Sequence, residues 1–474
     1  MQRLLLGPEI FFFSAVIVFT ILAMRPARHP RADFFTALFL AAAGMVVCLA
    51  AARSEGLLFG GTYSVDLYSQ VFKVMLSMGL FLVVCICPDL GGVDRKVHPE
   101  FYLLLFACTL AMMILVSAVH LLTIYVALEL SSYSLYILVA LQRRQESGLE
   151  ASLKYFLIGV CASAVMLFGL AILYGSVKAV YLRELAQVLP AAIERPLVVI
   201  GLVLSLGGFF FKLAVFPFHF WAPDVYQAAP NQVAAFIASA SKVAAVAILM
   251  RFVAISGNST YLAQTLVALA IVSMTVGNLA AVAQKDFNRL MAYSSIAHAG
   301  YVLIGILSMN AAGYAATIFY ALSLLLMKFT CFLVLVKVAG DGGSLQIDQL
   351  AGLHRRSPLL AMALMLALFG LAGIPPTIGF TGKLLVFIAA MQQGYFTLVL
   401  IAMINVVISL YYYMLVIKAA YLLESAHDLP ALSISAPVKF LTGALVTAMV
   451  VIGIFPTHLI ELARAAARFL ALTL

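Results

Sequence analysis

The stretch FFKLAVFPFHFWAPDVYQAAP, residues 210–230, places a lysine near the end of an apolar run and a proline five residues later. The ammonium of Lys212 is costly at the centre of a bilayer, by at least ~2.5–3.5 kcal/mol on insertion scales. Pro217 lacks a backbone N–H and clashes with the preceding turn, so it kinks or interrupts the helix. Interrupted backbone is tolerated in a membrane only where protein or water satisfies it. We therefore expect a polar pocket at the break, occupied by Lys212 and stabilised by the carbonyls that the break frees.

The composition around this stretch is that of an integral membrane protein. Hydrophobic residues make up 65% of the 474 residues and charged residues 10%, whereas soluble domains carry about 25% charged residues. Each apolar run is long enough to cross a bilayer, and the fourteen runs are centred near residues 16, 42, 76, 108, 128, 162, 206, 240, 272, 297, 325, 374, 409 and 447. The connections are short. We therefore predict one all-α membrane domain, residues 1–474, with about fourteen transmembrane helices.

The charged loops predict the orientation of the chain. The net charge is +9, but no basic patch is interleaved with aromatic residues, so we expect lipid and not nucleic acid as the partner of this surface. Basic residues mark the cytoplasmic side of a membrane, and those of alternate loops are Arg25, Arg28, Arg31, Arg95, Lys96, Arg143, Arg144, Lys285, Arg289, Arg355 and Arg356. Only one opposing loop is basic, with Lys178, Arg183 and Arg195. With an even number of spans, both termini are predicted to face the periplasm.

Six ionisable residues lie deep in the apolar runs, where such residues are functional candidates by default. They are Glu129, Lys212, Lys242, His298, Lys328 and Lys383. Lys154 and Lys418 lie nearer span ends, where a lysine can extend its ammonium to the interface. For Lys73 and Lys337 the sequence leaves both interpretations open.

Polar residues share helix faces with several of these six. Helical spacing places Tyr125, Ser132, Tyr133 and Tyr136 beside Glu129, and Ser294, Ser295 and Tyr301 beside His298. Lys383 follows the double proline Pro375–Pro376, a second predicted break. Hydrogen-bonded seams between helices would explain one or two such residues, but six residues spread over six spans favour a proton relay. Because a carboxylate favours a charged lysine, we expect Glu129 to hold Lys212 charged and to release its proton towards Lys242.

No motif for chemistry in this chain is apparent. The glycine clusters form neither G-x-G-x-x-G nor a P-loop. The six cysteines, which we expect to be small buried hydrophobic residues, include no C-x-x-C spacing, and Cys85-Ile-Cys87 alone is a weak metal signal. We therefore predict no cofactor and no metal in this chain, and place any redox reaction in partner chains.

The sequence resembles the subunit N family of bacterial respiratory complex I, the NADH–quinone oxidoreductase. The matching stretches run from about residue 125 to 422: ALELSSYSLYIL, EASLKYFLIG, FKLAVFPFHFWAPDVYQAAP, RLMAYSSIAHAGYVLIG, AGIPPTIGFTGKLLVF and SLYYYMLVIKAAYL. Single pieces are shared with the sister subunits L and M and with multisubunit sodium/proton antiporters. The segment MKFTCFL departs from the family, and it adds Lys328 as a possible relay member.

The resemblance implies a fold and a set of roles. Spans four to eight and nine to thirteen should form inverted repeats, about residues 99–254 and 260–422, with spans seven and twelve interrupted. Proton-transfer roles fall on Glu129, Lys212, Lys242 and Lys383, and His298 should bridge them.

The implied function is proton translocation coupled to electron transfer from NADH to quinone, in a bacterial inner membrane. NADH, FMN, iron–sulfur clusters and quinone would bind to partner subunits, and subunits K and M would be neighbours. The alternatives are a subunit of a cation/proton antiporter or of a membrane-bound hydrogenase, and a structural scaffold.

Overall fold

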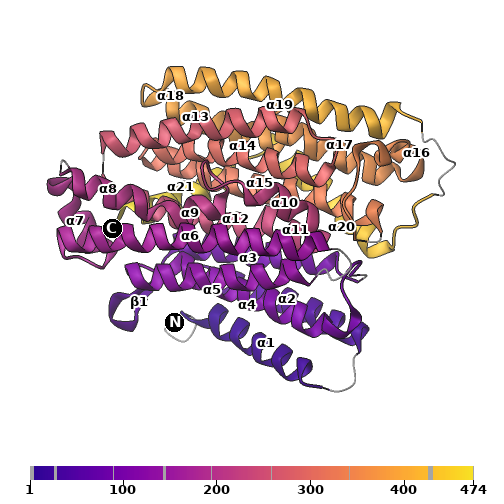
Figure 1. Ribbon diagram of the computed structural model, residues 1–474, viewed down its shortest axis with the longest axis horizontal. Helices are drawn as coiled ribbons and strands as arrows, with labels where there is room; N and C mark the ends of the chain where they lie inside the picture. Colours follow the sequence, from indigo (N-terminus) through magenta and orange to yellow (C-terminus); the bar gives the residue numbers. More distant parts are fainter. Residues whose placement is uncertain are drawn as a thin grey trace.

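The computed structural model describes residues 5–25, 29–88, 90–141, 146–193, 195–257, 259–340, 342–424 and 431–472, and within them it is nearly all helical (Figure 1). Most helices run side by side along the long axis of the molecule. Both chain ends lie towards the end of the molecule that carries β1 and α7, and α16 lies at the opposite end (Figure 1). This placement agrees with an even number of crossings.

The helices account for all fourteen predicted spans. Among the described residues, twelve helices are long and apolar enough to cross a membrane, and three apolar helices are shorter. The first half of the chain contains α1 (Gly7–Ala23), α2 (Pro30–Ala51), α3 (Leu67–Cys85), α4 (His98–Ser117), α5 (Leu121–Ala140), α6 (Glu146–Val177), α8 (Pro196–Ser205), α9 (Gly207–Leu213), α10 (Trp221–Ala228), α11 (Asn231–Phe236) and α12 (Lys242–Ala254). The second half contains α13 (Thr260–Val282), α14 (Phe287–Leu307), α15 (Ala311–Ala339), α17 (Pro358–Ala372), α18 (Ile378–Gln392), α19 (Phe396–Leu422) and α20 (Ala436–Ile454).

Short elements cover the ends of these helices. At one end, β1 (Gly56–Leu58) and β2 (Tyr63–Val65) form an antiparallel hairpin around the 3-10 turn η2 (Phe59–Gly61). Gly60 and Gly61 have positive φ, which a glycine adopts without strain. The remaining short elements are α7 (Leu182–Ala192), α16 (Leu353–Arg356), η3 (Arg95–Val97) and η5 (Ile347–Leu350).

The two predicted breaks are confirmed. The seventh span is interrupted after Leu213, where Ala214 adopts a left-handed conformation, and resumes at Trp221. The twelfth span is interrupted after Ala372, where Gly373 is left-handed, and resumes at Ile378. A third irregularity has no counterpart in the predictions: between α11 and α12 the helix widens into a π-helical turn, η4 (Ile237–Ser241), that ends directly before Lys242. Such turns are rare and occur frequently at functional sites.

Three predictions need correction or limits. The helix α21 (Thr457–Leu472) lies beyond the fourteen predicted spans and packs against α15 and α3. Cys161 is exposed on α6 and not buried. Arg28, Arg143 and Arg144, which entered the orientation prediction, lie outside the described residues.

Candidate proton-transfer site

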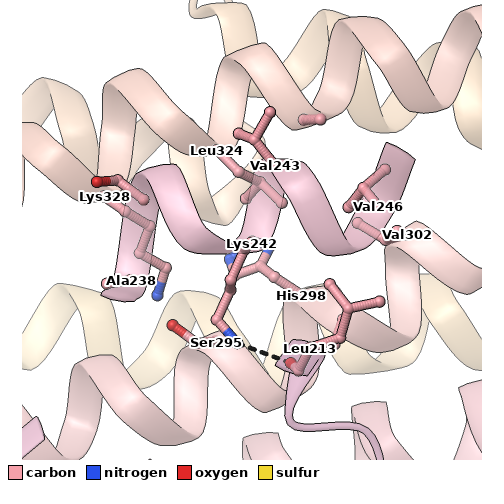
Figure 2. A pocket seen from close by; sticks show the side chains of 13 residues that line it. Leu213, Ala238, Lys242, Val243, Val246, Ser295, His298, Val302, Leu324 and Lys328 are labelled. Atoms are coloured by element: carbon pink, nitrogen blue, oxygen red, sulfur yellow. Dashed lines mark hydrogen bonds between the residues drawn. The ribbon is translucent and has the colours of Figure 1, made fainter. Parts of the chain in front are cut away.

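Three of the six candidate residues line one enclosed cavity. Lys242 from α12, His298 from α14 and Lys328 from α15 surround a space of about 20 Å³ (Figure 2). A space of this size can hold a water molecule when polar groups line it. His298 and Lys328 are buried and Lys242 is partly buried, so the cavity is a polar centre within the apolar core.

The first break supplies a ligand to Lys242. Its ammonium donates a hydrogen bond of 2.7 Å to the carbonyl oxygen of Leu213, the last residue of α9 (Figure 2). The neighbouring Phe211 carbonyl accepts a bond of 3.1 Å from Nε1 of Trp221, whose ring lies 6.0 Å from the Lys242 ammonium. Carbonyls at a helix end lack intrahelical partners. Our expectation that these carbonyls stabilise Lys212 is therefore wrong, because Lys242 on the next span takes that place.

Lys212 points instead towards α5. Its ammonium donates to the hydroxyl oxygens of Ser131 at 2.7 Å and Ser132 at 3.1 Å. Glu129, two residues before Ser131, accepts a short hydrogen bond from Ser163 on α6. Glu129 and Lys212 are thus neighbours whose connection runs through α5 and not through a direct contact in the part of the chain described here.

His298 and Lys328 belong to one hydrogen-bond network. Nδ1 of His298 lies 2.6 Å from the Tyr320 hydroxyl and Nε2 lies 3.2 Å from the Tyr413 hydroxyl. The Tyr413 hydroxyl also makes a short hydrogen bond with Ser294, and Ser294 accepts a bond of 2.7 Å from the Lys328 ammonium. Hydroxyl groups both donate and accept, so this network offers a continuous route for a proton between the imidazole and the lysine.

Lys383 lies at the second break. Its ammonium donates to the carbonyl oxygens of Leu371 at 2.7 Å and Ala372 at 3.2 Å, the last two residues of α17. The ring of Tyr301 lies 4.6 Å from the same ammonium, a distance at which the face of an aromatic ring attracts a cation. The prediction that a proline break accommodates a lysine therefore describes Lys383 well.

Several residues of this arrangement escaped the sequence analysis. Ser131 lies beside the predicted Ser132 within ALELSSYS. The only indication in the sequence is that a lysine side chain is long enough to reach two adjacent hydroxyls. Tyr320 and Tyr413 lie in apolar runs where tyrosine is common, so nothing in the sequence distinguishes them. Their assignment depends on which helices pack together, and the roles of all six candidates stay predictions.

The structure also decides the open case of Lys73 and shows the surroundings of Lys154, which we predicted to extend towards the interface. Lys73 is fully buried and forms an ion pair of 2.7 Å with Glu9 on α1, so it does not reach the interface. Lys154 is half-exposed and pairs with Glu150 at 2.8 Å and with Asp224 at 3.0 Å. None of the residues in these three ion pairs lines the central cavity.

No group of three or more histidine, cysteine, aspartate or glutamate residues in the described ranges could hold a metal ion. What the site does contain is a set of lysines, hydroxyls and one imidazole, carried by transmembrane helices of which two are interrupted. This fold and site define a membrane protein of the antiporter-like class.

The chain belongs to the NADH:quinone oxidoreductase/Mrp antiporter transmembrane family, whose model matches residues 118–409. It is 61% identical to NADH-quinone oxidoreductase subunit N 2 of Syntrophobacter fumaroxidans over 98% of each chain. It is similar at 33% identity to a chain of respiratory complex I from Thermus thermophilus, with a TM-score of 0.84 over 96% of this chain and 99% of that one. A chain of the Mrp complex from Dietzia sp. has a TM-score of 0.88 over 99% and 98% of the two chains, but its 21% identity shows the fold alone.

Proposed function

We propose that this chain translocates protons as a membrane subunit of an NADH–quinone oxidoreductase. The observation that carries the proposal is the line of buried titratable groups from α5 to α18, which has the central cavity in its middle. Each of these groups has a hydrogen-bond partner in the structure. The names of the relatives at 61% and 33% identity support the assignment to this enzyme.

The order of the groups suggests the order of transfer. Glu129 and Lys212 would form the first station, and Lys242 would accept the next proton because its carbonyl partner, Leu213, adjoins Lys212 in the chain. From the cavity, the proton would pass through His298 and Lys328 to Lys383. Moving one charge against 100 mV costs about 2.3 kcal/mol, so changes of a few kcal/mol in these contacts suffice to gate the movement.

We place the redox chemistry in partner subunits. NADH, FMN, iron–sulfur clusters and quinone would bind there, and subunits K and M would be neighbours of this chain. The membrane would be a bacterial inner membrane with both termini in the periplasm. The ranges 99–254 and 260–422, each with one interrupted span, would be inverted repeats.

The antiporter alternative has weaker support. The likeness to the Mrp chain rests on 21% identity and concerns the fold, whereas the family model covers both kinds of protein. A structural scaffold would not need lysines that are buried against carbonyls and hydroxyls.

The test is Lys212→Ala in the assembled complex in membrane vesicles. Proton uptake, NADH-driven electron transfer and assembly are measured together. We expect proton pumping to fall about tenfold or more, equivalent to about 1.4 kcal/mol in a barrier, with the complex still assembled. Lys418→Ala, at an exposed lysine of α19, is the matched control. Normal pumping by an assembled Lys212→Ala complex would refute the proposal.

A further inference from the structure

A second polar seam lies between α13 and α19, which pack side by side (Figure 1). Nδ2 of Asn278 donates to the side-chain oxygen of Asn405 at 3.0 Å and to its backbone oxygen at 3.2 Å. Asn405 in turn donates to the Thr275 hydroxyl at 3.4 Å. None of these residues belongs to the six candidates, and the carboxamides are 0% and 3% exposed.

The seam is connected to the central network. The Tyr412 hydroxyl donates a bond of 3.0 Å to Oδ1 of Asn278. The ring of Tyr412 lies 4.4 Å from that of Tyr413, and the Tyr413 hydroxyl contacts His298. Buried carboxamides are expensive unless paired, and Asn278 and Asn405 satisfy each other in a polar path that leads away from the proton site.

The other end of the seam approaches a surface cavity of about 580 Å³. Ser259, Gln264, Ile271, Ser308, Gln393 and Tyr395 are among its lining residues, and we call it the vestibule. It lies where α13 begins, α14 ends and α18 connects to α19. Ile271 precedes Thr275 by one helical turn, about 5–6 Å along the axis, so the seam stops one turn short of the vestibule.

We propose that Asn278, Asn405, Tyr412 and Thr275 form a gated exit branch, through which protons leave the central network for the vestibule. This inference rests on the proposed function and deepens it. The vestibule opens at the end of the molecule that carries α7 and the hairpin, which the charge pattern predicts to be the periplasmic side.

The geometry indicates a gate that is closed in this structure. Oδ1 of Asn278 accepts a hydrogen bond from the Tyr412 hydroxyl, and its Nδ2 donates a hydrogen bond to Oδ1 of Asn405. An amide is a poor proton carrier, so the paired carboxamides block transfer while they contact each other. When they separate, a water molecule can replace one amide contact. It accepts the Tyr412 hydroxyl proton while the central network reprotonates Tyr412, and it passes a proton to the Thr275 oxygen while Thr275 releases its own proton towards the vestibule. Only O–H bonds form and break, and no electron moves.

The test uses the assembled complex with Asn405→Leu, which closes the seam with an apolar side chain of similar size. We expect the protons pumped per electron to fall about tenfold, equivalent to about 1.4 kcal/mol, because protons reach the central network without leaving it. Ser409→Ala is the control, since its buried hydroxyl donates a hydrogen bond to the Val406 carbonyl of its own helix. Normal pumping by Asn405→Leu refutes the exit branch.

A second experiment applies if Asn405→Leu fails to assemble. Thr275→Cys is treated with a membrane-impermeant thiol reagent added on the vestibule side, and labelling at position 275 is read by peptide mapping. We expect labelling that accelerates during turnover, and none in Ser409→Cys. Absence of labelling at position 275 refutes the exit branch. If Lys212→Ala pumps normally while position 275 is labelled, the proposed function fails and the seam is merely a water-accessible crevice.

Discussion

At both broken spans, a lysine ammonium binds the carbonyl oxygens that the break leaves without helical partners, but the two lysines come from different spans. At the first break, the freed Leu213 carbonyl binds Lys242 from the following span. At the second break, the Leu371 and Ala372 carbonyls bind Lys383 from the same span. The comparison teaches that a helix break creates acceptors for a cation, and that the packing of neighbouring helices decides which lysine reaches them.

The largest effect should come from replacing a lysine with a residue that carries the same charge but cannot release its proton. Arginine stays protonated in proteins, so Lys242→Arg and Lys383→Arg should assemble yet lose proton pumping by about tenfold or more, which is at least about 1.4 kcal/mol. Vesicle acidification and NADH oxidation are measured together, and Lys418→Arg serves as the control. If either variant pumps at the parent rate, the ammonium at that break is a structural ligand and the two breaks differ in function.

A medium effect is expected at Lys212, where the structure departs from the sequence interpretation. Ser131→Ala with Ser132→Ala removes both hydroxyl acceptors of its ammonium. Hydrogen bonds to charged groups contribute about 1.5–3 kcal/mol. Because water can occupy the space of the deleted hydroxyls and replace part of this contribution, we expect a severalfold decrease in pumping at unchanged assembly. Ser134→Ala is the control, because its hydroxyl binds the Leu130 carbonyl of its own helix. An unchanged pumping rate in the double variant would indicate that the carbonyls of the break, and not the two hydroxyls, stabilise the Lys212 ammonium.

Much of the fold could be predicted because the bilayer imposes a simple pattern on the sequence. Apolar runs of spanning length give the helices, and Pro217 and the Pro375–Pro376 pair give the breaks. The π-helical turn before Lys242 left no trace, since IASAS reads as ordinary apolar helix. The amphipathic α21 was missed because it lacks the length and hydropathy of a span.

The candidate site also has a part that the sequence predicts and a part that it does not. A lysine or glutamate in an apolar run is conspicuous, so all six candidates could be named in advance. Their partners could not be named, because backbone carbonyls carry no sequence signal and the tyrosines near His298 resemble core residues. Tertiary packing determines that Lys212 binds the Ser131 hydroxyl and not the Leu213 carbonyl. The spacing of residues along one helix cannot predict this.

The smallest effect should distinguish the aromatic rings at the two breaks. Trp221→Phe keeps a ring near Lys242 but removes the Nε1–H donor to the Phe211 carbonyl. A neutral hydrogen bond contributes about 0.5–1.5 kcal/mol, so we expect a slightly lower Tm and almost normal pumping. At the second break, Tyr301→Phe should leave both quantities nearly unchanged, because its buried hydroxyl, although near Asn278, makes no hydrogen bond of normal geometry within the described residues. Thermal unfolding of the purified complex provides the comparison. A larger loss of proton pumping in Tyr301→Phe than in Trp221→Phe would show that the Tyr301 hydroxyl takes part in proton transfer from Lys383.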